Sequence, residues 1–449
     1  MRIDTKHIGG WLLLWGALDL LCAMCCEIHA DEAYYRLYGQ FLDWGYFDHP
    51  PMVALMTALS ALIVPYGTSL ILKNLSVRLV TVLMHMATVY VVWRTIKPAA
   101  PANQPSVLKF LLIAASIPMF CAYGFMTTPD APLLFFAALF YYAYRRLMNE
   151  RVNELTSERV TVALLGISMA GMLYSKYMAL LVILFAVIGN RRLLVNPKAW
   201  AAVGLAAVLM IPHLWWQYAH GFPSIVHQWG DRAVTYQAFF TLDYIPNQWA
   251  AFNPVVWVLM LWAGVRAVRS GDAYARSMGV TVWGFQLFFL LMTVRQHVEP
   301  HWTIVTAIPA IILLTEDWQQ AADNSLFRWK GVRIALYSCV ALVLAARIVL
   351  MLNVLPAQTG LAGKQAYYEE LHRQAEGRPV IFGGSFQHAS LYRFFYDDQA
   401  ARVRQRGDRY NQFDLWHLEN EWMGKPACIM RYGKVTMTDA LTEEDLSDE

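Results

Sequence analysis

The sequence predicts a mainly α-helical membrane protein with many spans and a small α/β domain near its C-terminal end. Of its 449 residues, 57% are hydrophobic and only 15% are charged. The apolar residues form long blocks separated by short basic or aromatic loops, which is the pattern of helices that cross a bilayer. The net charge is only +3. Because the lysines and arginines lie in the loops, we interpret them as determinants of topology and expect no nucleic-acid partner.

About eleven apolar blocks are long enough to cross a membrane. No small-residue cleavage site follows the first block, so we expect it to remain as an uncleaved helix. Two blocks meet at Ser175-Lys176-Tyr177, where one long tilted helix is the alternative. The expected spans are 8–27, 74–93, 107–125, 131–148, 160–175, 177–190, 198–219, 247–266, 277–293, 302–316 and 333–354.

The distribution of positive charge predicts the orientation of these spans. With the N-terminus in the cytoplasm, the inner loops receive most of the cations, as the positive-inside rule requires. The opposite, periplasmic side then receives 28–73, 126–130, Lys176, 220–246, 294–301 and everything after about 355. This orientation predicts a protein of the inner membrane with every conspicuous acid and histidine on its periplasmic side.

The first outer loop carries two amphipathic segments. Residues 32–44 and 51–64 have apolar and aromatic side chains at helical spacing, and Gly45 and Pro50-Pro51 separate them. We expect two helices lying at the membrane interface.

The character of the sequence changes at about residue 356. The elements expected beyond it are a strand at Val380-Ile381-Phe382, a helix at 386–396 and a second strand at 427–432. We therefore predict a transmembrane domain at 1–355 and a small periplasmic α/β domain at 356–449. Such a domain is short for holding its own core, so we expect it to lean on the membrane part of the chain.

The loop after the first span begins with two adjacent acids, Asp31 and Glu32. Acids beside a membrane span persist where they face water or a polar cavity, and a partly dry carboxylate can act as a general base toward a hydroxyl. The alternative is that Asp31 caps the following helix. Only one of the two acids needs to face a cavity, and we favour Asp31.

Asp48 and Asp130 are two further acids that could belong to a site, and each has a structural alternative. Asp48-His49 precedes Pro50-Pro51 and could bind a metal ion or orient a phosphate, unless it is only a solvated turn. Asp130 follows Thr127-Thr128-Pro129 at the start of a span. It could be a second catalytic or acceptor-binding acid, or it could simply favour the positive end of the helix dipole.

The remaining candidates are cations and histidines of the outer loops. His227 and Arg232 suit an anionic head group, although an interfacial aromatic belt is the alternative. In the run from Arg295 to Trp302, two histidines and Glu299 fit no strong zinc pattern, whereas Arg295 suits a phosphate. For Lys176 and Arg78, snorkelling to the interface is the alternative to a binding role.

Five motifs carry a resemblance to a known family. They are Asp31-Glu32-Ala33-Tyr34-Tyr35, Gly45-Tyr46-Phe47-Asp48-His49-Pro50-Pro51, Thr128-Pro129-Asp130-Ala131-Pro132-Leu133, Ser175-Lys176-Tyr177 and Glu299-Pro300-His301-Trp302. Together they resemble the GT-C glycosyltransferases that use polyprenyl-phosphate sugars, in the bacterial branch related to protein O-mannosyltransferases and lipid A aminoarabinose transferases.

The resemblance implies catalytic roles for Asp31 and Asp130. It implies that the donor phosphate contacts Arg232, Lys176, Arg295 and His49, and that sugar or acceptor contacts Glu32, Tyr35, Glu299 and His301. Some relatives bind a divalent metal ion, which would fall here to Asp48 and His227. The aminoarabinose transferases have an acid and a lysine where this chain has Asp48-His49, which is one departure. The C-terminal run Asn411-Gln412-Phe413-Asp414 resembles the soluble region of many relatives, and we assign no chemistry to it.

The predicted function is an inverting glycosyltransferase on the periplasmic face. It would move a sugar from an undecaprenyl- or dolichyl-phosphate donor to a hydroxyl of a lipid, glycan or protein acceptor. Two other classes remain open, namely a transporter or flippase of lipid-linked sugars and a non-catalytic scaffold of a surface-polysaccharide assembly.

Overall fold

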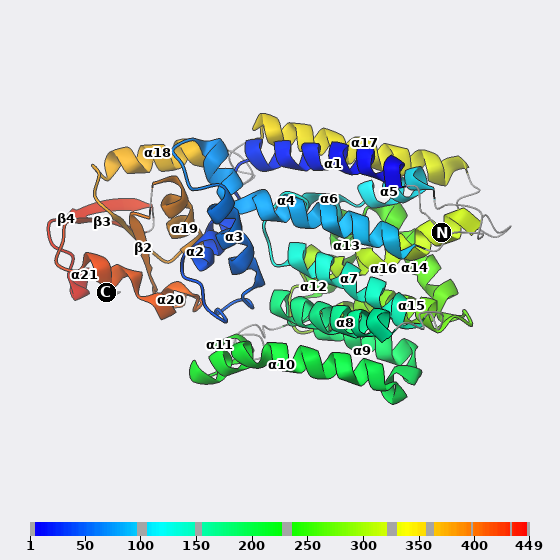
Figure 1. Ribbon diagram of the computed structural model, residues 1–449. Helices are drawn as coiled ribbons and strands as arrows, with labels where there is room; N and C mark the ends of the chain where they lie inside the picture. Colours follow the sequence, from blue (N-terminus) through cyan, green and yellow to red (C-terminus); the bar gives the residue numbers. More distant parts are fainter. Residues whose placement is uncertain are drawn as a thin grey trace. The chain divides into compact units, whose positions relative to one another are not determined.

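The computed structural model describes residues 5–96, 106–148, 155–226, 236–320, 330–355, 363–396, 398–431 and 433–446. These residues are mainly helical, with one small sheet, as predicted (Figure 1). The chain divides into two compact units. A transmembrane unit comprises Met1–Leu21 and Thr81–Arg347, and a second unit, the loop unit, comprises Cys22–Val80 and Ile348–Glu449. The loop unit therefore joins the first outer loop to the C-terminal part, whereas a domain boundary at 355 stays a prediction.

Each expected span coincides with one or more helices, and several spans are interrupted. Within the described residues, five helices are long and apolar enough to cross a membrane, or six if one bent pair counts as a span. The five are α1 (Thr5–Cys25), α4 (Leu70–Thr95), α10 (Pro197–Ala219), α15 (Ala273–Met292) and α17 (Lys330–Leu352). The predicted number of eleven spans stays a prediction.

Proline and asparagine break several of the shorter spans. Helix α8 (Leu155–Ser175) ends before α9 (Ala179–Gly189) begins, so this region forms two helices and the single long helix is excluded. Helices α5 (Val107–Ala115) and α6 (Pro118–Ala122) meet at Pro118, which has no N–H to continue the helical ladder. Helices α13 (Tyr244–Phe252) and α14 (Pro254–Val268) meet at 97°.

The transmembrane unit packs these helices in neighbouring pairs. Helix α7 (Asp130–Met148) contacts α8, α8 contacts α10, and α14 contacts α15; α8 and α10 run side by side in Figure 1. The remaining elements of the unit are η1 (Arg191–Val195), α11 (Pro223–Val226), α12 (Ala238–Leu242), η3 (Pro300–Thr306) and α16 (Ala307–Gln320). Such close helix packing holds a bundle together in lipid, where there is no hydrophobic drive between helices.

The loop unit contains the two predicted interfacial helices and the α/β elements. Helices α2 (Ala30–Gln40) and α3 (Met52–Ile63) form where the amphipathic segments were predicted. The C-terminal elements are α18 (Lys364–Gln374), β1 (Val380–Gly383), α19 (Phe386–Phe395), β2 (Ala400–Val403), α20 (Phe413–Trp416), η6 (Leu418–Trp422), β3 (Ala427–Arg431), β4 (Lys434–Thr438) and α21 (Glu443–Leu446). The strands predicted at 380–382 and 427–432 are therefore confirmed.

The sheet has the strand order β2-β1-β3-β4 (Figure 1). Strand β1 pairs in parallel with β2 and β3, and β3 pairs antiparallel with β4. Sequence reasoning missed β2 and β4. Strand β2 begins with two alanines and lacks the alternation of apolar and polar residues that identifies a strand. Strand β4 alternates, but it is short and mostly exposed.

Alongside a smaller cluster in the sheet, one large hydrophobic cluster holds the loop unit together. It combines Tyr34 and Tyr38 of α2 with Val53 of α3, Tyr392 of α19 and Phe413 of α20. These residues come from both ends of the chain, and α19 packs directly on α2. The C-terminal part thus shares its core with the first loop.

Substitution of Gly39 tests the crossing of α2 and α3. A Cβ at Gly39 would lie 2.3 Å from Thr57 Oγ1 and 2.8 Å from the backbone nitrogen of Ala58. We expect Gly39→Ala to reduce the free energy of unfolding by about 1–3 kcal/mol, because the helices must separate. Thermal unfolding of the purified protein in detergent measures the change.

Gly204 of α10 is the matched control, because a Cβ there meets nothing within 4 Å. Gly204→Ala should leave the unfolding midpoint unchanged or raise it, since alanine has the better helix propensity. Equal midpoints for Gly39→Ala and Gly204→Ala would contradict the close crossing.

Candidate functional site

Asp31 lies in the first turn of α2 with its side chain open to solvent. The N-cap of this helix is His29, whose Nδ1 accepts the Asp31 N–H at 3.3 Å, and Glu32 accepts the His29 N–H at 3.0 Å. The capping role considered for Asp31 is therefore taken by His29. The Asp31 side chain is 45% exposed. Of the two adjacent acids, Asp31 is thus the one that an incoming group can reach.

The pKa of Asp31 is raised above its ordinary value. Burial of the surrounding region is the main cause, and the negative charges of Asp48 and Glu32 add to it, whereas His29 and Arg409 act in the opposite direction. A carboxylate with a raised pKa takes up a proton more readily, which is the property that a general base needs.

Glu32 forms a buried ion pair with Arg78 of α4. Nε of Arg78 donates to Oε1 at 2.7 Å, and Nη2 donates to Oε2 at 2.6 Å. The Glu32 side chain is 0% exposed and the Arg78 side chain is 1% exposed.

Arg78 also donates to the backbone carbonyls of Ala23, Cys26 and Glu27. Arg78 therefore does not snorkel, because its charge is fully neutralised inside the protein. The Glu32 carboxylate has no exposed surface in this structure, so its sugar contact stays a prediction.

Asp48 is the centre of a second polar cluster. Its Oδ2 accepts the hydroxyl protons of Tyr34 at 2.8 Å and Tyr38 at 3.1 Å, and its Oδ1 accepts from Arg409. Burial raises the pKa of both tyrosines well above the ordinary value, so they remain neutral donors. Asp48 is only 6% exposed, which excludes the solvated turn. The neighbouring His49 lies 3.1 Å from the Tyr35 hydroxyl.

The metal site predicted at Asp48 gains no support from its neighbours. Among the residues that the structure describes, no three His, Cys, Asp or Glu side chains gather as metal ligands. The oxygens of Asp48 instead bind two hydroxyls and a guanidinium. His227 and Arg232 lie outside the described residues.

The C-terminal part contributes three contacts to this cluster. Besides Arg409, the backbone nitrogen of Gln412 donates to the Tyr34 hydroxyl at 2.7 Å, and Oε1 of Gln412 accepts the Phe47 N–H at 2.7 Å. Sequence reasoning assigned no chemistry to this segment. This segment lies more than 350 positions from the first loop in the sequence, and no local pattern predicts a contact over that separation.

Asp130 and Lys176 form a second buried ion pair, in the transmembrane unit. Nζ of Lys176 lies 2.8 Å from Oδ1 and 2.7 Å from Oδ2 of Asp130, and both side chains are buried. The structure thus brings together two residues that were predicted separately. Snorkelling is wrong for Lys176 as well, because its ammonium is neutralised by Asp130.

The loop before η3 holds the other predicted residues. His297 lies between Asp243 at 3.0 Å and Glu299 at 3.3 Å, and its hydrogen bond to Asp243 raises the pKa of its imidazole. Arg295 and His301 are partly exposed. Half of the Glu299 side chain is exposed, so both Glu299 and His301 remain accessible to a ligand.

Sequence reasoning missed a buried charged triad inside three spans. Asp19 of α1 lies 2.8 Å from His85 Nδ1 of α4 and 2.7 Å from Arg347 Nη1 of α17. The signal was present, because Asp19 and Arg347 each interrupt an apolar span. Ionisable groups inside a membrane pair with one another, and here the pairing joins three helices.

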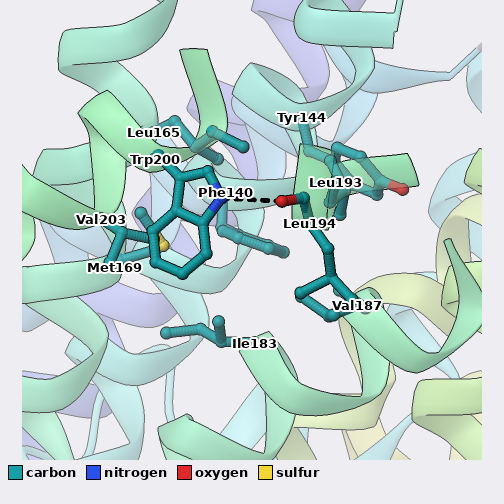
Figure 2. A pocket seen from close by; sticks show the side chains of 12 residues that line it. Phe140, Tyr144, Leu165, Met169, Ile183, Val187, Leu193, Leu194, Trp200 and Val203 are labelled. Atoms are coloured by element: carbon teal, nitrogen blue, oxygen red, sulfur yellow. Dashed lines mark hydrogen bonds between the residues drawn. The ribbon is translucent and has the colours of Figure 1, made fainter. Parts of the chain in front are cut away.

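An apolar pocket of about 100 Å³ lies between α7, α8, α9, η1 and α10 (Figure 2). Phe140, Met169 and Val203 line it, and Trp200 closes one side with its indole N–H donating to the Leu194 carbonyl at 2.8 Å. No charged side chain lines this pocket, so it offers no group for acid–base chemistry.

The fold and these buried polar clusters define an integral membrane protein of the GT-C fold. Residues 48–216 match the family described as dolichyl-phosphate-mannose-protein mannosyltransferase. The chain is 28% identical over 331 residues to the lipid A galacturonosyltransferase RgtD of Rhizobium johnstonii, covering 69% of this chain and 63% of that protein. The sequence-based resemblance is thereby confirmed.

Solved structures share the fold over nearly the whole chain. The structure of ArnT from Cupriavidus metallidurans in the apo state matches with a TM-score of 0.64 and 14% identity over 94% of this chain and 93% of that one. The same protein bound to undecaprenyl phosphate matches with a TM-score of 0.63 and 15% identity, over 94% and 92% of the two chains.

Removal of Arg78 tests the role of the ion pair with Glu32. Arg78→Met should leave a buried carboxylate without a partner and lower the free energy of unfolding by about 3–5 kcal/mol. Thermal unfolding in detergent measures the loss. The control is Arg373→Met, which removes an exposed pair with Glu370 and should leave the unfolding midpoint nearly unchanged. Equal losses of stability in the two variants would show that the ion pair of Arg78 stabilises the protein no more than an exposed pair does.

Proposed function

We propose that this protein is an inverting glycosyltransferase that moves a sugar from a polyprenyl-phosphate carrier to an acceptor hydroxyl. The observation that carries the proposal is Asp31, an exposed carboxylate of raised pKa on a helix anchored by the ion pair between Glu32 and Arg78. The GT-C fold adds support. ArnT, which shares it, is known in a structure bound to undecaprenyl phosphate.

In the proposed reaction, Asp31 is the general base. It accepts the proton of the acceptor hydroxyl while the hydroxyl oxygen attacks the anomeric carbon of the sugar. The bond between that carbon and the phosphate oxygen breaks, and the lipid phosphate leaves with the electron pair. Attack from the face opposite the phosphate inverts the configuration. A positioned base of this kind contributes about 10²–10⁴-fold to a rate.

Cations would stabilise the negative charge that develops on the leaving phosphate. We propose Arg295 for this role, because it is partly exposed in a loop of the predicted periplasmic side. Lys176 is a second candidate, with Asp130 as the acid that holds its ammonium in place. Glu299 and His301 are proposed to contact the sugar or acceptor.

The relatives suggest the substrates. The name of RgtD, a lipid A galacturonosyltransferase, supports lipid A as an acceptor and an acidic sugar as the transferred group. The predicted orientation, with the N-terminus in the cytoplasm, would place the reaction at the periplasmic face of the inner membrane. A flippase or a scaffold would need neither Asp31 nor its raised pKa.

Replacement of Asp31 tests the catalytic role. In membranes supplied with the lipid-linked sugar, Asp31→Asn should reduce transfer by about 10²–10⁴-fold, because the base is lost while the shape is kept. Mass spectrometry of envelope glycolipids and glycoproteins from cells carrying the variant should show one missing sugar and a rise in its polyprenyl-phosphate form.

Asp43→Asn is the matched control, because Asp43 lies exposed in the same loop. It should keep full transfer. Full transfer by Asp31→Asn would refute the assignment. Loss of transfer only when the C-terminal part is disrupted, with Asp31→Asn active, would favour the scaffold.

The pH dependence of transfer tests the state of Asp31. The base must be deprotonated to act, so the rate should fall as the pH decreases through the raised pKa of Asp31. When its imidazole is protonated, His29 lowers that pKa. His29→Asn keeps a capping side chain but removes the charge, and should move the acid limb of kcat/KM to higher pH.

The control is His417→Asn, at an exposed pair with Glu419, which should leave the acid limb of kcat/KM at the same pH. An acid limb at the same pH in wild type and His29→Asn would contradict this assignment of the base.

A further inference from the structure

We infer that Arg409, from the C-terminal part of the chain, belongs to the substrate site beside Asp31 and binds an anionic group of the glycosyl donor. The inference rests on the proposed function and deepens it by assigning chemistry to the segment that sequence reasoning left without any. Both residues belong to the loop unit.

The contrast in exposure between Arg409 and its partner is the first observation. Asp48 is only 6% exposed, whereas the Arg409 side chain is 41% exposed. The Arg409 side chain therefore lies at the edge of the polar cluster, paired with the buried Asp48 and partly open to solvent. Its five N–H donors form a planar fork that matches the oxygens of a phosphate or a carboxylate.

The loop that carries Arg409 is held in place by a buried arginine. Arg402 is buried and donates to Asp414 at 2.6 Å and to Asp408 at 3.3 Å. Asp408 also accepts the backbone N–H of Gln405 at 2.8 Å. These contacts fix the residue directly before Arg409. A binding group that is already positioned loses little conformational entropy when a ligand arrives.

Aromatic contacts fix the side chain of Arg409 from a second direction. Its guanidinium lies 5.7 Å from the ring centroid of Phe386. Phe386 in turn packs at 4.6 Å on Tyr34, whose hydroxyl donates to Asp48. Arg409, Asp48 and the helix that carries Asp31 are therefore parts of one packed arrangement.

The electrostatic coupling between Arg409 and Asp31 agrees with this arrangement. Arg409 lowers the pKa of Asp31, although burial raises it overall. A cation near the base would hold the donor's anionic group close to the reacting hydroxyl. Asp48 already accepts two tyrosine hydroxyls, so the cluster does not depend on Arg409 alone to satisfy this carboxylate.

Two parts of a donor could supply the anion, namely the phosphate of the carrier lipid and a carboxylate on an acidic sugar. Both present paired oxygens to the guanidinium. Binding of three lipids to the full-length protein in detergent, measured by native mass spectrometry, separates them. The lipids are undecaprenyl phosphate, undecaprenyl-phosphate galacturonate and undecaprenyl-phosphate galactose.

The variants are Arg409→Gln, Arg409→Lys and the matched control Arg404→Gln. Arg404 is exposed on the same loop, where it stacks on the Tyr410 ring at 4.2 Å. Loss of a hydrogen bond to a charged group corresponds to a roughly tenfold or greater weakening of binding. We expect that loss in Arg409→Gln, partial recovery in Arg409→Lys, and no change in Arg404→Gln.

The pattern across the lipids identifies the anion. Equal weakening for all three lipids assigns Arg409 to the phosphate, and weakening for the galacturonate lipid alone assigns it to the sugar carboxylate. Unchanged binding of all three by Arg409→Gln overturns the inference.

Two further variants separate this inference from its alternatives. Asp48→Asn breaks the same ion pair but keeps the guanidinium, so it should retain lipid binding. Equal loss of lipid binding in Asp48→Asn and Arg409→Gln would mean that the ion pair is merely structural, and would overturn the inference.

The Asp31→Asn variant should bind all the lipids that the wild type binds. If the wild type binds none of them, the proposed donor fails together with this inference. If Asp31→Asn binds and Arg409→Gln binds equally well, only the inference fails.

Discussion

The buried ion pair between Glu32 and Arg78 is the contact on which the candidate site depends. It fixes the first turn of α2 to α4, and the backbone carbonyls before α2 satisfy the remaining donors of Arg78. Two charges removed from water are stable only with such complete pairing. Because Glu32 is held inside, its neighbour Asp31 is turned outward. One interaction therefore determines which of two adjacent acids is available for chemistry.

The first loop and the C-terminal part form one folded unit around this pair. Tyr34 and Phe413, from the two ends of the chain, lie parallel in the shared core with their ring centroids 6.1 Å apart. Polar contacts repeat the connection, since Gln412 bonds to Tyr34 and Arg409 to Asp48. A C-terminal part built in this way is a structural support of the loop that carries Asp31. Its disruption would disturb the loop even if none of its residues met the substrate.

Buried ion pairs recur in the transmembrane unit. The triad of Asp19, His85 and Arg347 joins three helices, and Asp130 pairs with Lys176 at the start of α7. In a bilayer there is little hydrophobic drive between helices, so paired charges and close packing specify which helices meet. The two units thus use the same device, a buried carboxylate neutralised by a cation from a distant segment.

Much of this could be predicted from the sequence. The helical blocks, the amphipathic pair α2 and α3, and the strands β1 and β3 follow from local patterns of hydropathy, charge and turn residues. The broken helices at Pro118 and Asn253 were not predicted, nor were β2 and β4. In these cases the local signal is weak, and neighbouring elements decide the conformation.

What the sequence by itself determined is the class of the protein, because blocks of apolar residues depend only on neighbours within a few residues. Which of Asp31 and Glu32 is exposed was decided by the tertiary structure, through the ion pair between Glu32 and Arg78. The partners of the charges were decided only by the tertiary structure. For Arg78 and Lys176 the sequence left snorkelling and a binding role open, yet each is buried against a carboxylate 46 positions away in the chain. Arg409 meets Asp48 across 361 positions. No local pattern encodes such pairings, since they arise when the chain folds and each buried charge must find its counterion.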